Sequence, residues 1–336
     1  MTIIHKYSYP VLIAASLLVM AACNSSVKPE KKQNDNKVVK TVNVPVFNAD
    51  SAYYFIQKQL SFGPRVPNTK AHRDCGDWLA ATLRQYNAEV TEQRTKLRAF
   101  DGTMLDARNI IGSFNPETRS RIMLCSHWDS RPWADHDPDI ANRKKPVPAA
   151  NDGASGVGVL LELARVLSSE NPGVGVDIIF FDAEDYGEPQ DYRGSYQDAW
   201  ALGSQYWSRN PHTPGYSARF GILLDMVGAD GAVFSQEAYS RYYAPNIVRK
   251  VWETAERIGY GNVFINRNVG QVIDDHLYVN EYLRIPTIDI IDYSDERDKG
   301  FFDYWHTIGD DIDKISKQTL KAVGQTVTTV VFEAGQ

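Results

Sequence analysis

Four acidic residues follow a strand-like run near the middle of the chain. The run "VDIIFF" (176–181) is typical of a buried β-strand, and Asp182, Glu184, Asp185 and Glu188 come directly after it. Removing carboxylates from water beside an apolar strand is costly unless positive charges or hydrogen-bond donors meet them. A divalent cation would offset their mutual repulsion and keep them ionised. The spacing therefore raises the question of which positive group these acids meet.

Polar residues also stand at the ends of other strand-like runs. They are His127 and Asp129 after "IMLCS", Asp225 after "GILL", His306 after the last run, and Asp152 just before an apolar helical pattern. Because the carboxyl ends of parallel strands meet at one edge of a sheet, we expect these side chains to lie close together. Imidazole nitrogens and carboxylate oxygens are ligands that Zn²⁺ accepts at about 2.0–2.2 Å. The sequence therefore predicts a zinc site at this edge.

Each of these residues also has a simpler interpretation. Asp152 stands where a helix N-cap is expected, and His127 alone would more often be a packed or solvated histidine than a metal ligand. Asp274 and Asp275, like the acids at 310–313, resemble first-turn residues that the helix dipole favours. Their joint occurrence at successive strand ends nevertheless favours the metal site.

Strands and helices must alternate to position these residues. Strand-like runs cover 107–113, 121–127, 175–182, 220–228 and 287–293. Helical patterns cover 48–63, 72–87, 153–169, about 203–208, 244–259 and a C-terminal segment from about 313. This alternation predicts a three-layer α/β/α sandwich around a mainly parallel sheet, and we expect it to be mixed because the early strands can pair antiparallel.

The composition is that of an ordinary globular protein. The chain has 336 residues, of which 43% are apolar and 23% charged, enough to bury a sizeable core. The formal net charge of -6 gives no electrostatic reason to expect a nucleic-acid partner. Neither an internal repeat nor a second linker follows residue 45, so we expect one catalytic domain over 46–336. We expect Cys75 and Cys125 to be free thiols.

The N-terminus has the pattern of an export signal. Lys6 precedes a short apolar run that ends at Cys23. The small residues before Cys23 resemble a lipobox, which predicts a signal peptide over 1–22 and a lipid on Cys23; ordinary cleavage is the alternative. Residues 23–45 are polar and rich in lysine, which predicts an anchor and flexible tether. We therefore expect an exported, periplasmic protein that touches a membrane through this anchor alone.

The motif "HWDS…NDGASGVGVLLELAR…FFDAED…LLDMVGA…WHT" carries a resemblance. In order and spacing, across 121–313, it is similar to the zinc-exopeptidase-like fold shared by two-metal aminopeptidases and type II (animal-type) glutaminyl cyclases. The resemblance implies that Asp152, Asp185 and His306 bind zinc and that Glu184 is the general acid/base.

Three features resemble the cyclases, single-zinc enzymes that convert N-terminal Gln to pyroglutamate and release ammonia. Trp305 precedes His306 where a cyclase indole forms a wall of the substrate pocket. The segment "VIDDHL" resembles one whose first Asp pairs with another, here Asp274 with Asp225. The run "PQDYRGSYQDAWALGSQYW" resembles the cyclase segment after the acidic pair. Two carboxylates in contact share a proton, so such a pair suits an α-amine better than a second zinc ion.

The chain also departs from the cyclase pattern. Asp185 replaces a Glu, which is one methylene longer. The indole expected shortly after the acidic pair is missing, and Trp200 or Tyr186 is expected to replace it in substrate binding. Asp289 stands where animal cyclases have His, and we assign it to the substrate site as well.

The sequence thus predicts a zinc-dependent glutaminyl-peptide cyclotransferase with one zinc ion per chain. Its expected partners are peptides or proteins with N-terminal Gln, and a monomer is expected. The alternative is a two-zinc aminopeptidase in which His127 and Asp225 join the metal ligands, because a fold alone does not decide chemistry. A third interpretation is a binding module that kept the fold without catalysis.

Overall fold

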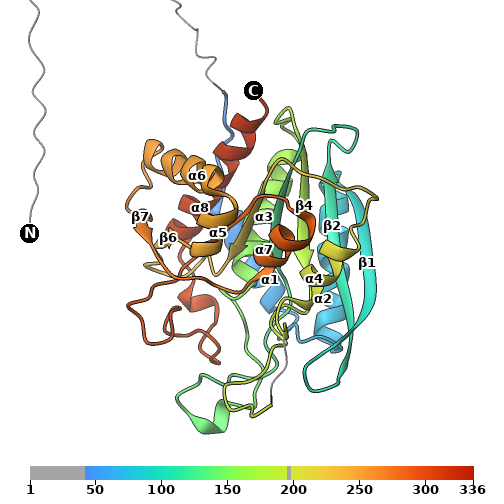
Figure 1. Cartoon of the computed structure of the whole chain (residues 1–336), viewed down its shortest axis with the longest axis vertical. Coiled ribbons are helices and arrows are strands. Elements are labelled where there is room, and N and C mark those ends of the chain that lie inside the picture. Colours follow the sequence, from blue (N-terminus) through green and yellow to red (C-terminus); the bar gives the residue numbers. More distant parts are fainter. Residues whose placement is uncertain (1–41, 195–197) are drawn as a thin grey trace, which may run out of the picture. The chain divides into compact units, whose positions relative to one another are not determined.

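The structure, a computed structural model, describes residues 42–194 and 198–336 (Figure 1). The predicted signal peptide, Cys23 and the predicted tether up to residue 41 lie outside the described residues. Residues 42–336 gather into one compact unit. In the described part of the chain, no helix is long and apolar enough to cross a membrane. The two cysteines described there, Cys75 and Cys125, are buried and unpaired, as predicted.

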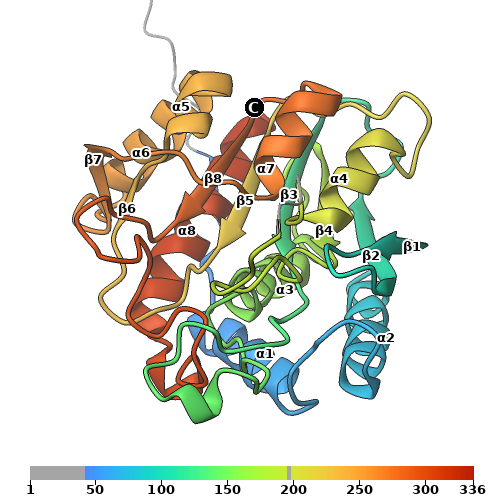
Figure 2. The ribbon, with the colours of Figure 1, turned by 60° about the horizontal axis from the view of Figure 1, so that its bottom comes forward.

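A six-stranded sheet runs through the centre of this unit (Figure 2). Its strands are β1 (Glu89–Arg98), β2 (Met104–Phe114), β3 (Arg121–His127), β4 (Gly175–Phe181), β5 (Gly221–Asp225) and β8 (Thr287–Ile291). They lie in the order β1-β2-β4-β3-β5-β8. Strand β2 is antiparallel to β1 and β4, whereas β4, β3, β5 and β8 run parallel. The predicted mixed, mainly parallel sheet is confirmed.

Helices cover both faces of the sheet. They are α1 (Ala49–Leu60), α2 (Lys70–Gln85), α3 (Ala154–Leu167), α4 (Leu202–Arg209), α5 (Ala238–Tyr243), α6 (Pro245–Arg257), α7 (Asp275–Tyr278) and α8 (Lys317–Ala334). Figure 2 shows α4 and α7 on one side of the strands and α1, α2 and α3 on the other. Along β3, Ile122 and Leu124 face the core of α3, while Met123 and Cys125 face that of α4. This alternation of period two produces the three layers.

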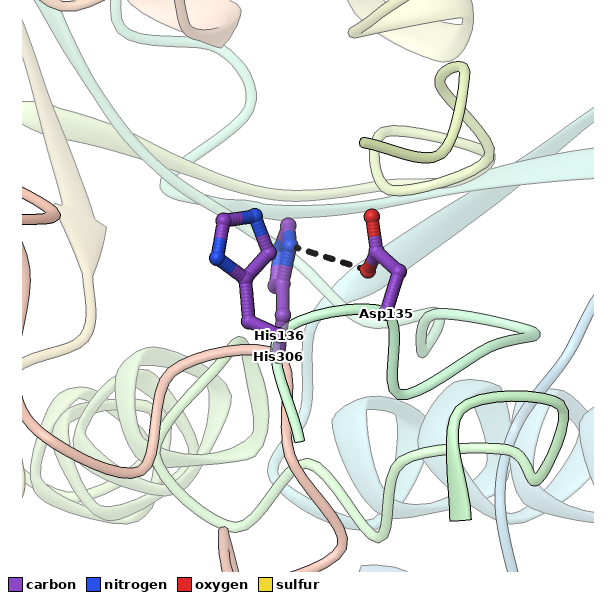
Figure 3. Close-up of side chains that lie close together, drawn as sticks. All are labelled: Asp135, His136 and His306. Carbon is purple, nitrogen blue, oxygen red and sulfur yellow. Dashed lines mark ion pairs between the residues drawn. The ribbon is translucent and has the colours of Figure 1, made fainter. Parts of the chain in front are cut away.

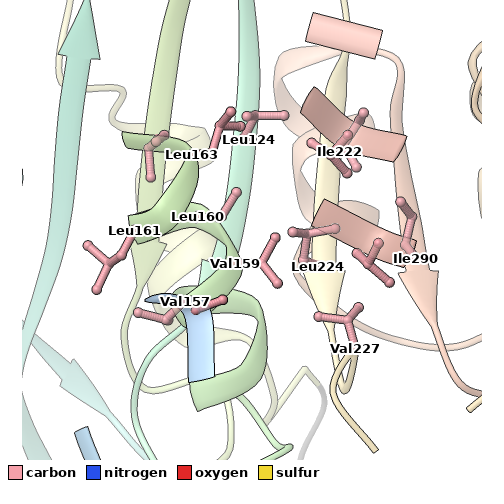
Figure 4. Packing of buried hydrophobic residues seen from close by; sticks show 14 of the residues in the cluster. Leu124, Val157, Val159, Leu160, Leu161, Leu163, Ile222, Leu224, Val227 and Ile290 are labelled. Carbon is pink, nitrogen blue, oxygen red and sulfur yellow. The ribbon is translucent and has the colours of Figure 1, made fainter. Parts of the chain in front are cut away.

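Helix α3 lies directly on the sheet (Figure 4). Its sequence is apolar nearly all round, and Val157, Leu160 and Leu161 are fully buried. A Cβ atom on Gly156 would clash with the backbone oxygen of Leu224, so only glycine lets the first turn of α3 approach β5 so closely. This approach brings the residues just before α3 to the ends of β3 and β5.

Several elements differ from the sequence-based expectation. Strand β1 was not predicted, because "EVTEQRTKLR" is an edge strand whose side chains are largely exposed and charged. Helix α5 and the small sheet of β6 (Phe234–Gln236) and β7 (Phe264–Asn268) were also missed, whereas the helix start expected at Asp274 and Asp275 is that of α7. The last helix begins at Lys317, and Asp311 instead caps a short 3₁₀ helix (Ile312–Lys314). Asp152 is not a side-chain cap, because Gly153 occupies the N-cap position of α3.

Candidate active site

The ends of β3, β4 and β5 bring the predicted site residues together beside the start of α3. His127 and Asp225 are the last residues of β3 and β5, and Asp185 follows β4 by four positions. Asp152 lies two residues before α3, and His306 comes from the segment between β8 and α8. All five side chains are buried.

Two possible metal-binding groups share Asp152. In the first, Asp152, Asp185 and His306 offer ligand atoms within 4.8 Å of one another; in the second, Asp152 does so with His127 and Asp225. Asp152 Oδ2 lies 3.5 Å from His306 Nε2, and its Oδ1 lies 3.0 Å from His127 Nε2. His306 Nε2 is 3.3 Å from Asp185 Oδ1, and His127 Nε2 is 3.2 Å from Asp225 Oδ1. Each oxygen of Asp152 thus faces a different group.

The first group fits a zinc ion by its chemistry. Zinc accepts both carboxylate oxygens and imidazole nitrogens, and three protein ligands leave one position open, as in catalytic zinc sites. Asp185 Oδ2 is buried and has no hydrogen-bond partner, which is costly for a carboxylate oxygen unless a cation binds it. The residues present therefore suit the metal that the sequence predicted.

Two further carboxylates hold the backbone of this group. Asp310, fully buried, accepts a hydrogen bond from the backbone N–H of Asp152 at 3.1 Å. Asp129 accepts from the N–H groups of Glu184 and Asp185 at 3.1 and 3.2 Å. Asp310 was predicted to be a helix-start acid, and the structure corrects this because its carboxylate instead accepts hydrogen bonds from the backbone N–H groups of Asn151 and Asp152.

Side chains of the protein itself meet part of the strand-end acids. Asp182 contacts His72, whose Nε2 lies 2.8 Å from Asp182 Oδ1. Asp185 Oδ1 lies 3.2 Å from Nη1 of Arg131, a fully buried arginine. The sequence analysis missed Arg131, because an isolated arginine in the run "HWDSRPW" has no periodicity that signals burial.

The sequence analysis also missed Asp135, whose carboxylate faces the Nδ1 side of the His306 imidazole. Asp135 Oδ1 lies 3.7 Å from His306 Nδ1, and Figure 3 shows both with the neighbouring His136. The His136 ring centroid is 5.6 Å from that of His306 and 4.5 Å from that of Trp305. Asp135 and His136 come from the segment that follows Asp129.

Carboxyl groups around the site hold protons more tightly than usual. Burial raises the pKa of Glu184 well above its ordinary value, and the charges of Asp274 and Asp185 raise it further. Burial likewise raises the pKa of Asp225 to about 6 and that of Asp274 to about 7. Asp225 and Asp274 can therefore exchange protons near neutral pH, and perturbed pKa values of this kind are typical of acid–base sites.

The predicted carboxyl pair belongs to a larger group of buried acids. Burial, and then the charge of Asp225, raises the pKa of Asp274, while Asp289 offers a carboxylate oxygen within 4.8 Å of one from Asp274. Asp289 is fully buried and does not line the pocket, so its assignment to direct substrate contact is corrected. It lies behind Asp274 because β8 places it inside the sheet layer.

A cavity of about 380 Å³ opens onto these residues. It is lined by Asp152, Glu184, Asp185, Trp200, Asp225, Met226, Gln271, Val272, Ile273, Asp274, Ile291, Tyr293, Lys299, Phe301, Trp305 and His306. The Trp305 and Trp200 rings stack on the His306 ring, with centroids 3.7 and 6.0 Å away. Trp200 therefore lines the cavity where a replacement for the missing indole is expected, whereas Tyr186 packs against Trp133 with centroids 5.2 Å apart.

This fold with a buried carboxylate–imidazole group at the strand ends defines a zinc-exopeptidase-like protein. The chain belongs to peptidase family M28, whose model matches residues 109–331. A glutaminyl cyclase from Bacteroides thetaiotaomicron is 57% identical, with 86% of this chain and 99% of that chain covered and a TM-score of 0.85. A Zn-dependent exopeptidase from Parabacteroides distasonis is 53% identical, with the same coverage and TM-score.

Curated relatives are more distant and longer. Aminopeptidase YwaD of Bacillus subtilis is 27% identical over 88% of this chain, and the bovine glutaminyl-peptide cyclotransferase is 27% identical over 67%. The matches span 59% and 65% of those two proteins. The relatives thus include both activities that the sequence analysis weighed.

Proposed function

We propose that this chain is a zinc-dependent glutaminyl-peptide cyclotransferase, which converts the N-terminal Gln of peptides or proteins to pyroglutamate and releases ammonia. The observation that carries the proposal is the pocket, which joins a metal-binding group to two indoles and to acids with raised pKa values. The 57% identity with a bacterial glutaminyl cyclase supports it.

Glu184 is the proposed acid–base group. Asp152, Asp185 and His306 would hold the zinc ion, and the chemistry supplied there is Lewis-acid polarisation of the side-chain carbonyl of the substrate Gln. Glu184 lines the pocket and is 8% exposed, and its raised pKa suits a carboxyl that accepts a proton from the α-amine and returns it to the departing ammonia. The amine nitrogen bonds to the carbonyl carbon as the amide C–N bond breaks. Both partners belong to one residue, so proximity favours this step.

Asp225 and Asp274 are proposed to bind the α-amine. Both line the pocket, and a carboxyl pair sharing one negative charge can accept hydrogen bonds from an amine. Asp289 would support Asp274 from behind. Trp200 and Trp305 would pack against the apolar part of the Gln side chain and exclude water.

One zinc ion per chain is the proposed stoichiometry. The second group of His127, Asp152 and Asp225 is close enough to hold another ion, which is the observation that favours the aminopeptidase alternative. In that case a Leu-initiated peptide should lose its first residue. If the protein is a cyclase, His127 and Asp225 instead belong to a network of groups that share protons, and they bind no second zinc ion.

Product mass spectrometry on one Gln-initiated and one Leu-initiated peptide tests the proposal. The zinc-loaded protein should remove one ammonia from the Gln peptide and leave the Leu peptide intact. Release of free Leu with two zinc ions per chain would instead identify an aminopeptidase. If the protein releases neither ammonia nor Leu, the interpretation as a binding module remains.

We also propose that the protein is an exported, periplasmic monomer anchored through a lipid on Cys23. The N-terminal pattern supports this, although it lies outside the described residues. Replacing Cys23 with Ser should move the protein from the membrane fraction to the soluble fraction after export, while light scattering should give the mass of one chain.

A further inference from the structure

The side chain of Arg131 makes an unusual set of contacts inside the site. It is 1% exposed. Its Nε and Nη2 donate to the two oxygens of Asp135 at 2.7 and 3.0 Å, and Nη1 donates to Asp185 Oδ1 at 3.2 Å. The remaining donor contacts are with backbone carbonyls, those of Asp185, Gly187 and Glu188, at 3.2, 3.5 and 3.3 Å. One planar cation thus meets a proposed metal ligand and a second carboxylate together.

The second carboxylate leads to another proposed ligand. Asp135 Oδ1 faces His306 Nδ1 at 3.7 Å, and this nitrogen is buried without a hydrogen-bond partner (Figure 3). Asp135 also accepts from the backbone N–H of Gln190 at 2.8 Å, so its carboxylate is fixed from two directions. A carboxylate on the non-ligating nitrogen of a histidine commonly fixes the ring orientation and tautomer of a metal ligand.

The same guanidinium supports a wall of the pocket. The carbon at its centre lies 4.7 Å from the centroid of the Trp200 ring, within range of a cation–π interaction. The Trp200 ring in turn lies nearly parallel to the His306 imidazole, at 9°. Arg131 therefore contacts the wall that the substrate side chain would meet.

We propose that Arg131 is a positioning residue that directs the Asp185 carboxylate, orients the His306 imidazole through Asp135, and supports Trp200. This inference rests on the ligand set of the proposed function but not on which reaction the site performs. Lysine could supply the charge but not the fork, because an ammonium is a compact charge without the planar donors that bind Asp135 through both oxygens. Arg131 is thus expected to couple metal affinity to substrate binding.

The test compares Arg131→Lys with Asp135→Asn and with an exposed control, Arg94→Lys. Zinc affinity, measured by competition with a chromogenic chelator, should fall by about 10–100-fold in Arg131→Lys and in Asp135→Asn. The control should match the parent. Arg131→Lys should also raise KM, because Trp200 loses its support, whereas Asp135→Asn should leave KM nearly unchanged.

Three outcomes separate this inference from a merely structural role and from the proposed reaction. Parental zinc affinity in a folded Arg131→Lys variant would overturn it, as would fully additive losses in the double variant with Asp135→Asn. If Arg131→Lys does not fold, parental zinc affinity in Asp135→Asn overturns it. Zinc affinity is measured without turnover, so a parent that failed to cyclise Gln peptides would contradict the proposed function alone.

Discussion

The two imidazoles of the site, His306 and His127, lie on opposite sides of Asp152 and differ in their affinity for protons. Burial and the positive charge of Arg131 lower the pKa of His306 well below its ordinary value. Burial would also lower the pKa of His127, but the three carboxylates around it, those of Asp129, Asp152 and Asp225, raise that pKa well above the ordinary value. Without a metal ion, the His306 ring thus favours its neutral form and the His127 ring its protonated form.

This difference shows how one edge of a sheet can favour a single metal ion. A metal must displace protons from its ligands, and each displaced proton weakens binding at a given pH. On binding a metal, the group with His306 loses no proton from its imidazole, although burial also raises the pKa of Asp185 in that group. The group with His127 must lose the imidazole proton and, near pH 6, part of a proton from Asp225, whose pKa is about 6. The proton on His127 therefore opposes a second zinc ion.

The largest expected effect comes from replacing each imidazole in turn. His306→Gln should lower both zinc affinity and activity. The loss should exceed the roughly 10–100-fold loss that follows when a hydrogen-bond partner of a metal ligand is removed. His127→Gln should still bind one zinc ion per chain. Metal analysis after gel filtration checks both variants. Equal loss of zinc in the two would show that the groups do not differ as proposed.

Replacement of the acid–base group should separate chemistry from metal binding. Glu184→Gln keeps the shape but cannot accept a proton, so kcat should fall by about 10²–10⁴-fold. Its zinc content should equal that of the parent. A kcat close to the parental value would rule out the proposed role of Glu184, and the Arg94→Lys variant again serves as the control.

A change of pH should sharpen the contrast between the two groups. As pH rises, His127 and Asp225 lose protons, so affinity for a second zinc ion should increase while the first site, with a neutral imidazole, changes less. Titration at pH 6 and pH 8.5 should give one equivalent at the lower pH and a weaker second equivalent at the higher. Two tight equivalents at pH 6 would contradict the argument.

The smallest effect should be on stability, in the acid cluster behind Asp225. Burial, with the charge of Asp274, raises the pKa of Asp275 to about 8. A carboxyl whose pKa is raised on folding contributes stability below its unfolded pKa of about 3.9, and this is lost as pH rises through the folded value. Tm should therefore fall less steeply with rising pH in Asp275→Asn than in the parent. Between pH 5 and pH 9 the difference in the fall should be at least roughly 2–4 °C. Parallel Tm curves for parent and variant would contradict this.

The site residues that sequence reasoning found share a local signal. Asp152, Asp185 and Asp225 each stand beside an apolar strand or helix whose type and end could be read from a few neighbours, so the topology of the sheet was sufficient to bring them together. The alternation of strands and helices along the sequence likewise predicted the three layers of the fold. Strand β1 was missed because an edge strand in water needs no apolar face.

The residues that were missed depend on contacts between distant segments. Arg131 and Asp135 lie in a stretch without periodicity, and their burial follows from the way residues 130–150 fold over the strand ends. The closeness of Asp274 and Asp289 brings the N-cap of α7 beside β8, which no local pattern reveals. The sequence thus predicted which residues gather in the candidate metal group better than it predicted the charges around them.

The sharing of Asp152 by both groups also limits how such a site can diverge. Any replacement of this residue damages both groups at once, so a lineage cannot move between one-metal and two-metal chemistry by changing it. The available route is through residues that set proton affinity from behind, such as Asp274 and Asp289. Relatives with different reactions could therefore keep the same ligands in place and differ in the layer beneath them.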